Sequence, residues 1–236
     1  FSYDDLRTNS NASASLQKQD GDFTELAAVY GLTYDKRNRT FMPTDGSVFG
    51  FVQSLPIYAD KPFIDNTFRF STYHEFNENY VGSGKIFLSA INGLNDEDVR
   101  LSKRKSLSTR RLRGFSKGKI GPVDGNDHIG GNYAAAVNFD VNLPNLLPDS
   151  SNTDVSFFVD FGNVWEVDYD DSIDDSNKLR SSTGINASWI SPIGPMTFTL
   201  ATNLSKASTD TTESFNFNLG TSFSVSYTHL TLPTSG

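Results

Sequence analysis

Nine segments of this chain alternate apolar and polar residues with a period of two, and this pattern constrains the fold more than any other feature. In the segment Asn132–Asn142, for example, Tyr133 and Phe139 alternate with Asn138 and Asp140. Successive side chains of a strand point to opposite faces, so each segment predicts a strand with one apolar and one polar face. The predicted strands span about Asp22–Tyr34, Gly46–Leu55, Thr67–Phe76, Gly82–Asn92, Asn132–Asn142, Asp154–Trp165, Ser181–Ile190, Met196–Leu204 and Ser214–Phe223.

The lengths of the strands and of their connections favour a membrane barrel. Several strands reach the roughly 9–11 residues that a tilted strand needs to cross a bilayer. Long polar loops (Gly93–Asp127, Glu166–Arg180) alternate with tight turns near Asn77–Asn79 and Ser191–Pro195, as in outer-membrane barrels. The mean hydropathy of −0.40 and the 13% aromatic content fit strands whose two faces average out. A soluble all-β sandwich or barrel predicts the same alternation and is the alternative.

Charge and composition exclude several kinds of function. The net charge of −8 argues against general nucleic-acid binding, and the absence of cysteine excludes disulfide and thiolate chemistry. The acidic stretch Asp168–Asp175 lacks the glycine and the distal glutamate of a calcium-binding EF-hand loop, so we expect a solvated surface loop. The three histidines are scattered along the chain. We therefore expect no metal, no cofactor and no enzymatic activity.

The basic residues gather in one place, although the chain is acidic. Eight of the 20 lysines and arginines fall between Lys103 and Lys119, in a segment that contains Arg110–Phe115 (RRLRGF). A cationic, glycine-containing loop between two-faced strands predicts a loop that folds into a polar barrel lumen. The alternative is a solvated basic loop that touches lipid phosphates.

A guanidinium inside a lumen needs a carboxylate partner, because burying an unpaired charge is costly. Asp140 and Asp160 lie on the polar faces of two later strands, in runs that otherwise avoid charge. Our hypothesis is that Arg113 pairs with Asp160 and has Asp140 as a neighbour. Gly114 would allow a sharp turn at the loop tip, and Phe115 would pack against the lumen wall.

Five segments of the chain form a set of motifs in a fixed order. They are Phe41–Gly46 (FMPTDG), Arg113-Gly114-Phe115 preceded by Leu112, Phe157–Trp165 (FFVDFGNVW), Ser191–Pro195 (SPIGP) and Phe217–Phe223 (FNLGTSF). Taken together, they resemble the barrel of the BamA family of outer-membrane protein assembly factors, and the resemblance covers roughly Asp22 to Phe223 in the family's order.

The resemblance implies an all-β fold, an antiparallel transmembrane β-barrel. In that family the barrel has roughly sixteen strands and follows periplasmic POTRA domains, so this chain would be a C-terminal fragment of about nine strands. Arg113 would be the arginine at the tip of the lumenal loop, with Asp160 and Asp140 as its lumenal acidic partners. Leu112 stands where the family usually has valine. Asp140 stands where glutamate is common, which shortens its reach and makes Asp160 the safer partner.

The domain organisation follows from the same pattern. We expect residues 1–21 to be a partial extracellular loop, and residues 22–223 to be the C-terminal part of the barrel, with a long lumenal loop over residues 93–131. The chain starts with neither a methionine nor a signal-peptide pattern, so we expect a truncation. Val225–Thr234 breaks the strand pattern and resembles a translated sequencing adapter, so we expect residues 224–236 to be a non-native tail.

The resemblance also implies a function in the bacterial outer membrane. The protein would be an insertase that folds and inserts client outer-membrane proteins through a lateral seam at the last strand, whose seam residues are Phe215, Phe217, Leu219, Gly220 and Phe223. Its partners would be unfolded clients, accessory assembly lipoproteins and outer-membrane lipid, with no nucleic acid. The alternatives are a pore of two-partner secretion or an autotransporter assembly factor of the same superfamily. A passive porin would leave the Arg113 loop unexplained.

Overall fold

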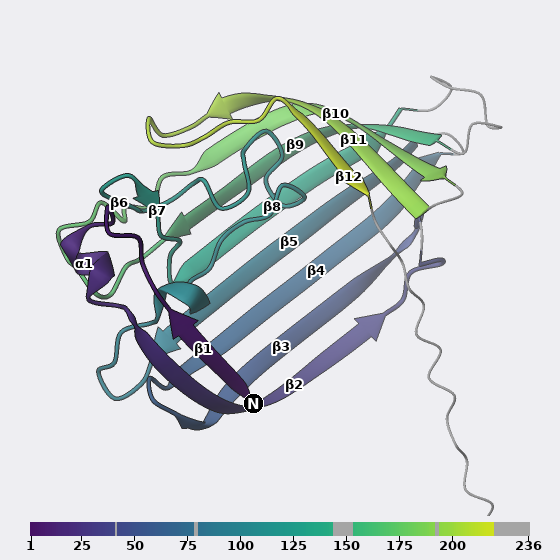
Figure 1. Cartoon of the computed structure of the whole chain (residues 1–236). Coiled ribbons are helices and arrows are strands. Elements are labelled where there is room, and N and C mark those ends of the chain that lie inside the picture. The colour runs from purple at the N-terminus through teal and green to yellow at the C-terminus, as the bar shows by residue number, and fades with distance from the viewer. Residues whose placement is uncertain (41, 78–79, 144–152, 192–193, 220–236) are drawn as a thin grey trace, which may run out of the picture.

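The protein is built around one open antiparallel β-sheet of ten strands in the order β1-β2-β3-β4-β5-β8-β9-β10-β11-β12. The computed structural model describes residues 1–40, 42–77, 80–143, 153–191 and 194–219. Figure 1 shows that the sheet curves and that the segment between β5 and β8 lies on its concave side. The strands are β1 (Ser2–Leu6), β2 (Gly21–Asp35), β3 (Gly46–Ala59), β4 (Phe63–Asn77), β5 (Tyr80–Gly93), β8 (Tyr133–Asn142), β9 (Thr153–Trp165), β10 (Arg180–Ser191), β11 (Gly194–Ser205) and β12 (Phe215–Leu219).

The remaining elements are short and lie in the loops. They are helix α1 (Ala14–Gln17), the 3₁₀ turn η1 (Leu101–Lys103) and a small hairpin of β6 (Val123–Asp124) and β7 (Asp127–His128). Among the described residues, no helix is long and apolar enough to cross a membrane.

All nine predicted strands are present, within a few residues of their predicted ends, and the last of them is described as far as Leu219. The tenth strand, β1, was not predicted. It pairs with the start of β2, from Ser2 opposite Glu25 to Leu6 opposite Gly21. The expectation of a loop over residues 1–21 therefore needs correction at Ser2–Leu6. This strand is five residues long and contains Asp4 and Asp5, so it shows no apolar alternation.

The convex face of the sheet carries a continuous band of apolar side chains. The pairing places Leu32 beside Phe51, Phe51 beside Phe68, and Phe68 beside Leu88. A band of this kind on the outward face is typical of a barrel that contacts lipid. Large exposed apolar side chains of the band include Tyr30, Leu32, Tyr34, Ile86, Leu88, Phe139, Val141, Phe157, Ile185, Leu200, Phe215 and Phe217.

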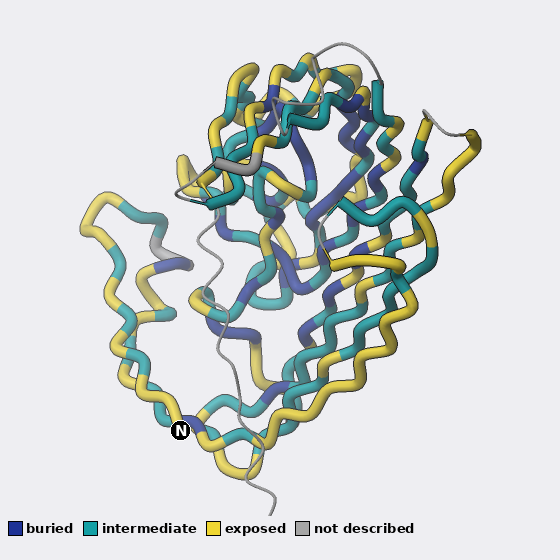
Figure 2. Tube along the Cα trace, turned by 90° about the vertical axis from the view of Figure 1, so that its right-hand side faces the viewer, coloured by how far each residue is buried: buried dark blue, intermediate teal, exposed yellow. Residues whose placement is uncertain are grey.

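The concave face carries the polar residues and is covered by the loop between β5 and β8. Figure 2 shows buried residues gathered where this loop meets the sheet, while much of the outer face is exposed. In the described part of the chain, β1 and β12 each pair with one neighbour, so the sheet is not closed.

The connections differ between the two ends of the sheet. At one end lie the long segments 94–132, between β5 and β8, and 166–179, between β9 and β10. At the other end, two-residue connections join β4 to β5 and β10 to β11. The asymmetry is incomplete, because the connection between β3 and β4 at the long-loop end spans only residues 60–62.

Candidate functional site

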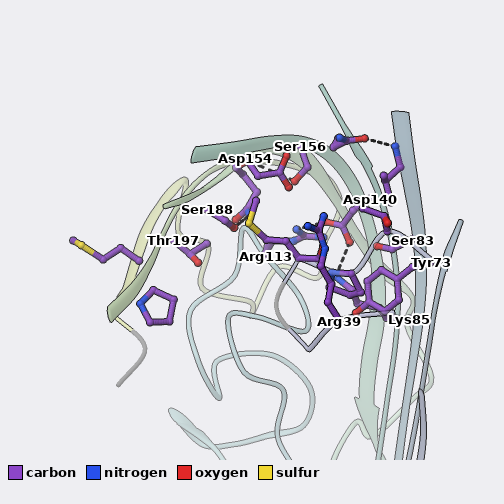
Figure 3. A pocket seen from close by; sticks show the side chains of 18 residues that line it. Arg39, Tyr73, Ser83, Lys85, Arg113, Asp140, Asp154, Ser156, Ser188 and Thr197 are labelled. Carbon is purple, nitrogen blue, oxygen red and sulfur yellow. Dashed lines mark hydrogen bonds and ion pairs between the residues drawn. The ribbon is translucent and has the colours of Figure 1, made fainter. Parts of the chain in front are cut away.

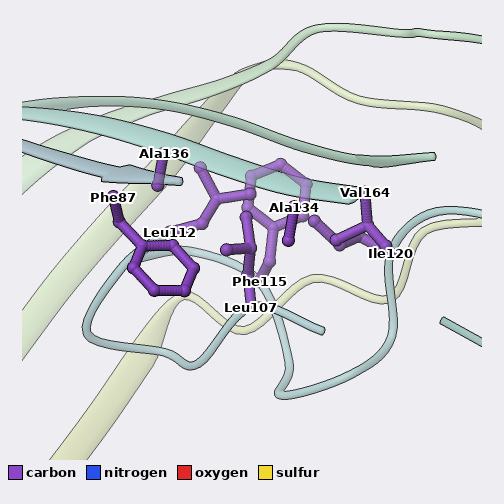
Figure 4. Packing of buried hydrophobic residues seen from close by; sticks show 8 residues of the cluster. All are labelled: Phe87, Leu107, Leu112, Phe115, Ile120, Ala134, Ala136 and Val164. Atoms are coloured by element: carbon purple, nitrogen blue, oxygen red, sulfur yellow. The ribbon is translucent and has the colours of Figure 1, made fainter. Parts of the chain in front are cut away.

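The loop over residues 94–132 is fixed to the concave face by an apolar cluster. Four of its members come from the loop and four from β5, β8 and β9, and Figure 4 shows the two groups facing each other. Phe115 is 2% exposed, so the structure places it against the lumen wall. The cluster consists of Phe87, Leu107, Leu112, Phe115, Ile120, Ala134, Ala136 and Val164.

The side chain of Arg113 lies next to this cluster and binds two carboxylates. Its Nε and Nη2 donate to the two oxygens of Asp160 at 2.7 and 2.6 Å, and its Nη1 donates to Asp140 at 2.6 Å. The backbone N–H of Arg113 also donates to Asp160, at 3.0 Å. Asp160 is fully buried and Arg113 is 8% exposed. The geometry is therefore a bidentate pair with Asp160 and a single contact with Asp140, and Figure 3 shows Arg113 and Asp140 side by side.

Further side chains contact the two carboxylates and the guanidinium of this ion pair. Asn138 donates to Asp160 at 2.7 Å, and Lys85 contacts the free oxygen of Asp140 at 3.2 Å. The guanidinium of Arg113 lies 3.7 Å from the ring centroid of Phe158, whose side chain faces the lumen and is fully buried. Burial alone would lower the pKa of Arg113, but its hydrogen bonds to Asp160 and the charge of Asp140 raise it. The arginine is therefore permanently charged and held by several strands.

Gly114 forms the turn that follows Arg113. Its φ is +85°, in the region that side chains rarely adopt. Its carbonyl accepts hydrogen bonds from the Asn203 side chain at 2.9 Å and from the Glu213 N–H at 3.0 Å. A Cβ here would lie 3.2 Å from Ala201 and 3.3 Å from Ser182. Only glycine lets the loop tip approach β10 and β11 this closely.

We therefore expect Gly114→Ala to destabilise the barrel by about 1–3 kcal/mol, from backbone strain and from close contacts. Gly118→Ala is the matched control, because Gly118 also has a positive φ, +66°, but a Cβ there would meet nothing within 4 Å. Urea unfolding of both variants in detergent micelles measures the difference. Equal losses of stability would show that packing at the tip is unimportant.

A second buried ion pair, which the sequence analysis did not predict, joins Arg180 to Asp210. Nε and Nη2 of Arg180 donate to the two oxygens of Asp210 at 3.0 and 2.9 Å. Their side chains are 4% and 0% exposed. Arg180 begins β10, and Asp210 lies in the connection between β11 and β12. Both residues belong to polar stretches without alternation, so no pattern in the sequence indicates that they pair.

The loops at the long-loop end are also tied together by charged side chains. Arg104 binds Asp168, and Arg100 donates to Glu25 at 2.9 Å. Asp168 accepts further hydrogen bonds from the N–H of Val99 and from Asn132. Burial raises the pKa of Asp168, but these hydrogen bonds and the charge of Arg104 outweigh it and leave the pKa below its usual value. The expectation of a solvated loop over Asp168–Asp175 is therefore wrong at Asp168.

Three of the predicted seam residues lie in β12. Phe215, Phe217 and Leu219 pair with Leu200, Phe198 and Met196 of β11. The other two, Gly220 and Phe223, and the predicted tail over residues 224–236 lie outside the described residues. In the part of the chain that the structure describes, no three histidine or acidic side chains converge to hold a metal ion.

The outward apolar band and the arginine-anchored inner loop are typical of part of an outer-membrane β-barrel that holds a structured loop in its lumen. A family model described as the Omp85 superfamily domain matches residues 1–223, and the chain belongs to this superfamily. It is thus part of a bacterial outer-membrane barrel.

Comparison with individual proteins gives the same assignment. The outer membrane protein assembly factor BamA of Neorickettsia risticii (strain Illinois) is 28% identical to this chain. The alignment is 239 residues long with its gaps and covers 93% of this chain. The protein of the same name from Neisseria meningitidis serogroup B is 31% identical over 141 residues, covering 48% of this chain and 17% of that protein. The crystal structure of BamA from Haemophilus ducreyi lacking POTRA domains 1–3 matches with a TM-score of 0.75 at 26% identity, over 83% of this chain and 42% of that one.

The chain spans 32% of the length of the Neorickettsia relative. These relatives are named as assembly factors and not as enzymes.

Proposed function

We propose that this chain is the C-terminal part of the barrel of an outer-membrane protein assembly factor, which folds client β-barrel proteins and inserts them into the membrane. The observation that carries the proposal is the lumenal loop anchored by Arg113 to Asp160, in a chain of the Omp85 superfamily. A passive porin keeps a water-filled channel, whereas in this chain a loop packs into the lumen.

The proposed mechanism uses the edge of β12, and no covalent bond is formed or broken. An edge strand offers unpaired N–H and C=O groups, to which an incoming client strand can add by β-augmentation. In the described part of the chain, β12 pairs only with β11. Phe215, Phe217 and Leu219 would present apolar side chains to lipid beside the entering strand.

The Arg113 loop supports this edge through direct contacts. The N–H of Glu213 donates to the carbonyl of Gly114, and the N–H of Ser116 donates to the carbonyl of Thr211, both at 3.0 Å. These bonds hold the connection that leads into β12. We therefore assign to the loop the role of positioning the seam strand.

The proposed partners are unfolded outer-membrane clients, accessory assembly lipoproteins and outer-membrane lipid. A polypeptide-secreting pore or an autotransporter assembly factor would use the same anchored loop. Depletion separates these functions: loss of an assembly factor lowers the levels of many outer-membrane barrels, whereas loss of a secretion pore removes one secreted polypeptide.

Site-specific photo-crosslinking tests the seam. A photo-reactive residue in place of Phe217 is expected to form adducts with client strands during assembly. The matched control carries the photo-reactive residue in place of Phe157. Phe157 also points outward and is 45% exposed, against 44% for Phe217, but it lies on β9, which has a neighbouring strand on each side. Client adducts of equal yield at both positions would contradict a seam at β12.

A further inference from the structure

A cavity of about 580 Å³ lies on the lumenal side, between the basic loop and strands β4 and β5. Five cationic side chains line it, and the described residues of its lining include no carboxylate. Arg69 and Lys85 come from the strands, and Arg110, Arg111 and Lys117 come from the loop. In a chain with a net charge of −8, this concentration of positive charge is not a consequence of composition.

The carboxylates near the loop are already occupied by other cations. Asp160 and Asp140 bind Arg113, Asp140 also contacts Lys85, and Asp65 binds Lys105. Within the described residues, Arg69, Arg110, Arg111 and Lys117 form no ion pair. Four of the five cations around the cavity therefore lack a counter-charge from this part of the chain.

The guanidinium of Arg111, which has no carboxylate partner among the described residues, is fixed in place by an aromatic ring. Its guanidinium stacks on Phe87, 3.3 Å from the ring centroid. Stacking uses the flat face of the guanidinium and leaves its N–H donors, which lie in the plane, available to an oxyanion. Burial and the charge of Arg69 lower the pKa of Arg111 to about 10, so it remains charged at neutral pH. The two arginines repel each other, and an anion between them would relieve that repulsion.

We infer that this cavity binds a ligand that carries phosphate groups. A terminal phosphate group carries about 1.5–2 negative charges and three strong acceptor oxygens, whereas a carboxylate carries one charge, so a terminal phosphate matches four free cations better. Ser108 and Thr109 add hydroxyl groups to the lining. The volume lies within the roughly 300–1,000 Å³ of small-molecule sites, so a diphosphate can enter the cavity. The source is either a free diphosphate or the headgroup of a phospholipid that ends in a phosphate, such as phosphatidic acid.

Calorimetric titration of the intact protein in detergent with sodium pyrophosphate, at low salt, tests the inference. We expect saturable binding that weakens at least about tenfold in Arg69→Gln/Arg111→Gln, because two charge-assisted contacts are lost. Lys119→Gln/Lys206→Gln is the matched control: it removes the same net charge from two exposed lysines that do not line the cavity. The control variant should bind like the unchanged protein.

A second arm identifies the source of the phosphate. Phosphatidic acid, whose headgroup is a terminal phosphate, should compete with pyrophosphate in mixed micelles if a lipid headgroup is the ligand, and phosphatidylcholine should not. Competition assigns a lipid source, and pyrophosphate binding without competition assigns a free phosphate compound.

Several results would overturn the inference. They are no binding of either probe, equal binding by the two double variants, or tighter binding of a glutamate-rich peptide than of pyrophosphate. Heat-dependent gel mobility checks that each variant is folded. If Arg69→Gln/Arg111→Gln does not fold, Lys117→Gln replaces it, with Lys119→Gln as its control.

Discussion

Asp160→Ala is expected to destabilise the folded barrel by about 3–5 kcal/mol, because it leaves the buried guanidinium of Arg113 without its main partner. The loss should exceed that of removing an ordinary hydrogen bond, since three donors of Arg113 converge on this one carboxylate. Urea unfolding of the refolded protein in micelles, followed by heat-dependent gel mobility, measures it.

A double-mutant cycle shows whether the loss comes from the pair. Arg113→Ala/Asp160→Ala should cost clearly less than the sum of the two single variants, because the double variant leaves no uncompensated charge. Lys85→Ala is the comparison: the ammonium of Lys85 contacts Asp140 at 3.2 Å, but its side chain is 39% exposed. It should cost no more than about 1 kcal/mol. Additive single losses would mean that the two residues act independently.

Exchanging the two charges gives a complementary result. Arg113→Asp alone should impair folding, and adding Asp160→Arg should restore part of the stability. Full recovery is not expected, because Asp160 also accepts the backbone N–H of residue 113, which an arginine at position 160 cannot do. The absence of any recovery would count against a direct pair.

Alternation predicted the strands and their two faces, because it assigns every strand residue to a face. Arg113 lies in a loop, and its role was expected from the basic segment and from the family resemblance. Asp140 and Asp160 were recognisable as charges on the lumenal face. Phe158 is an apolar residue on the polar face of β9, between Ser156 and Asp160. The structure gives the reason: its ring lies beneath the guanidinium of Arg113, so the exception is part of the arginine's binding site.

The sequence did not predict the contacts among loops. Arg180–Asp210 and Arg104–Asp168 join residues 30 and 64 positions apart. No periodic pattern connects such positions, and a loop's conformation depends on what it packs against. The same holds for β1, which is recognisable only by its pairing with β2. The cationic cavity is a similar case, since Arg69 joins the loop arginines only through the fold.

Arg180→Ala is expected to cost about 3–5 kcal/mol, because it leaves the fully buried carboxylate of Asp210 without a cation. Among the described residues, the carboxylate of Asp210 would then keep only the hydrogen bond that the N–H of Ala207 donates to it, at 2.6 Å. The connection between β11 and β12 would loosen at one of its attachments, while the bonds of Gly114 and Ser116 to this connection would remain. The variant should therefore lose stability and also position β12 less well.

Two measurements separate this expectation from a general loss of folding. Urea unfolding measures the stability. Photo-crosslinking from position 217 measures how often a client strand lies beside β12 in the folded fraction. Client adducts should decrease in folded Arg180→Ala. Lys178→Ala is the matched control, because Lys178 is only two residues away but forms an exposed pair with Asp174, with side chains 57% and 70% exposed. It should change the stability by no more than about 0.5 kcal/mol and leave the adducts unchanged. Unchanged adducts in folded Arg180→Ala would show that the loop of Arg113 alone positions the seam.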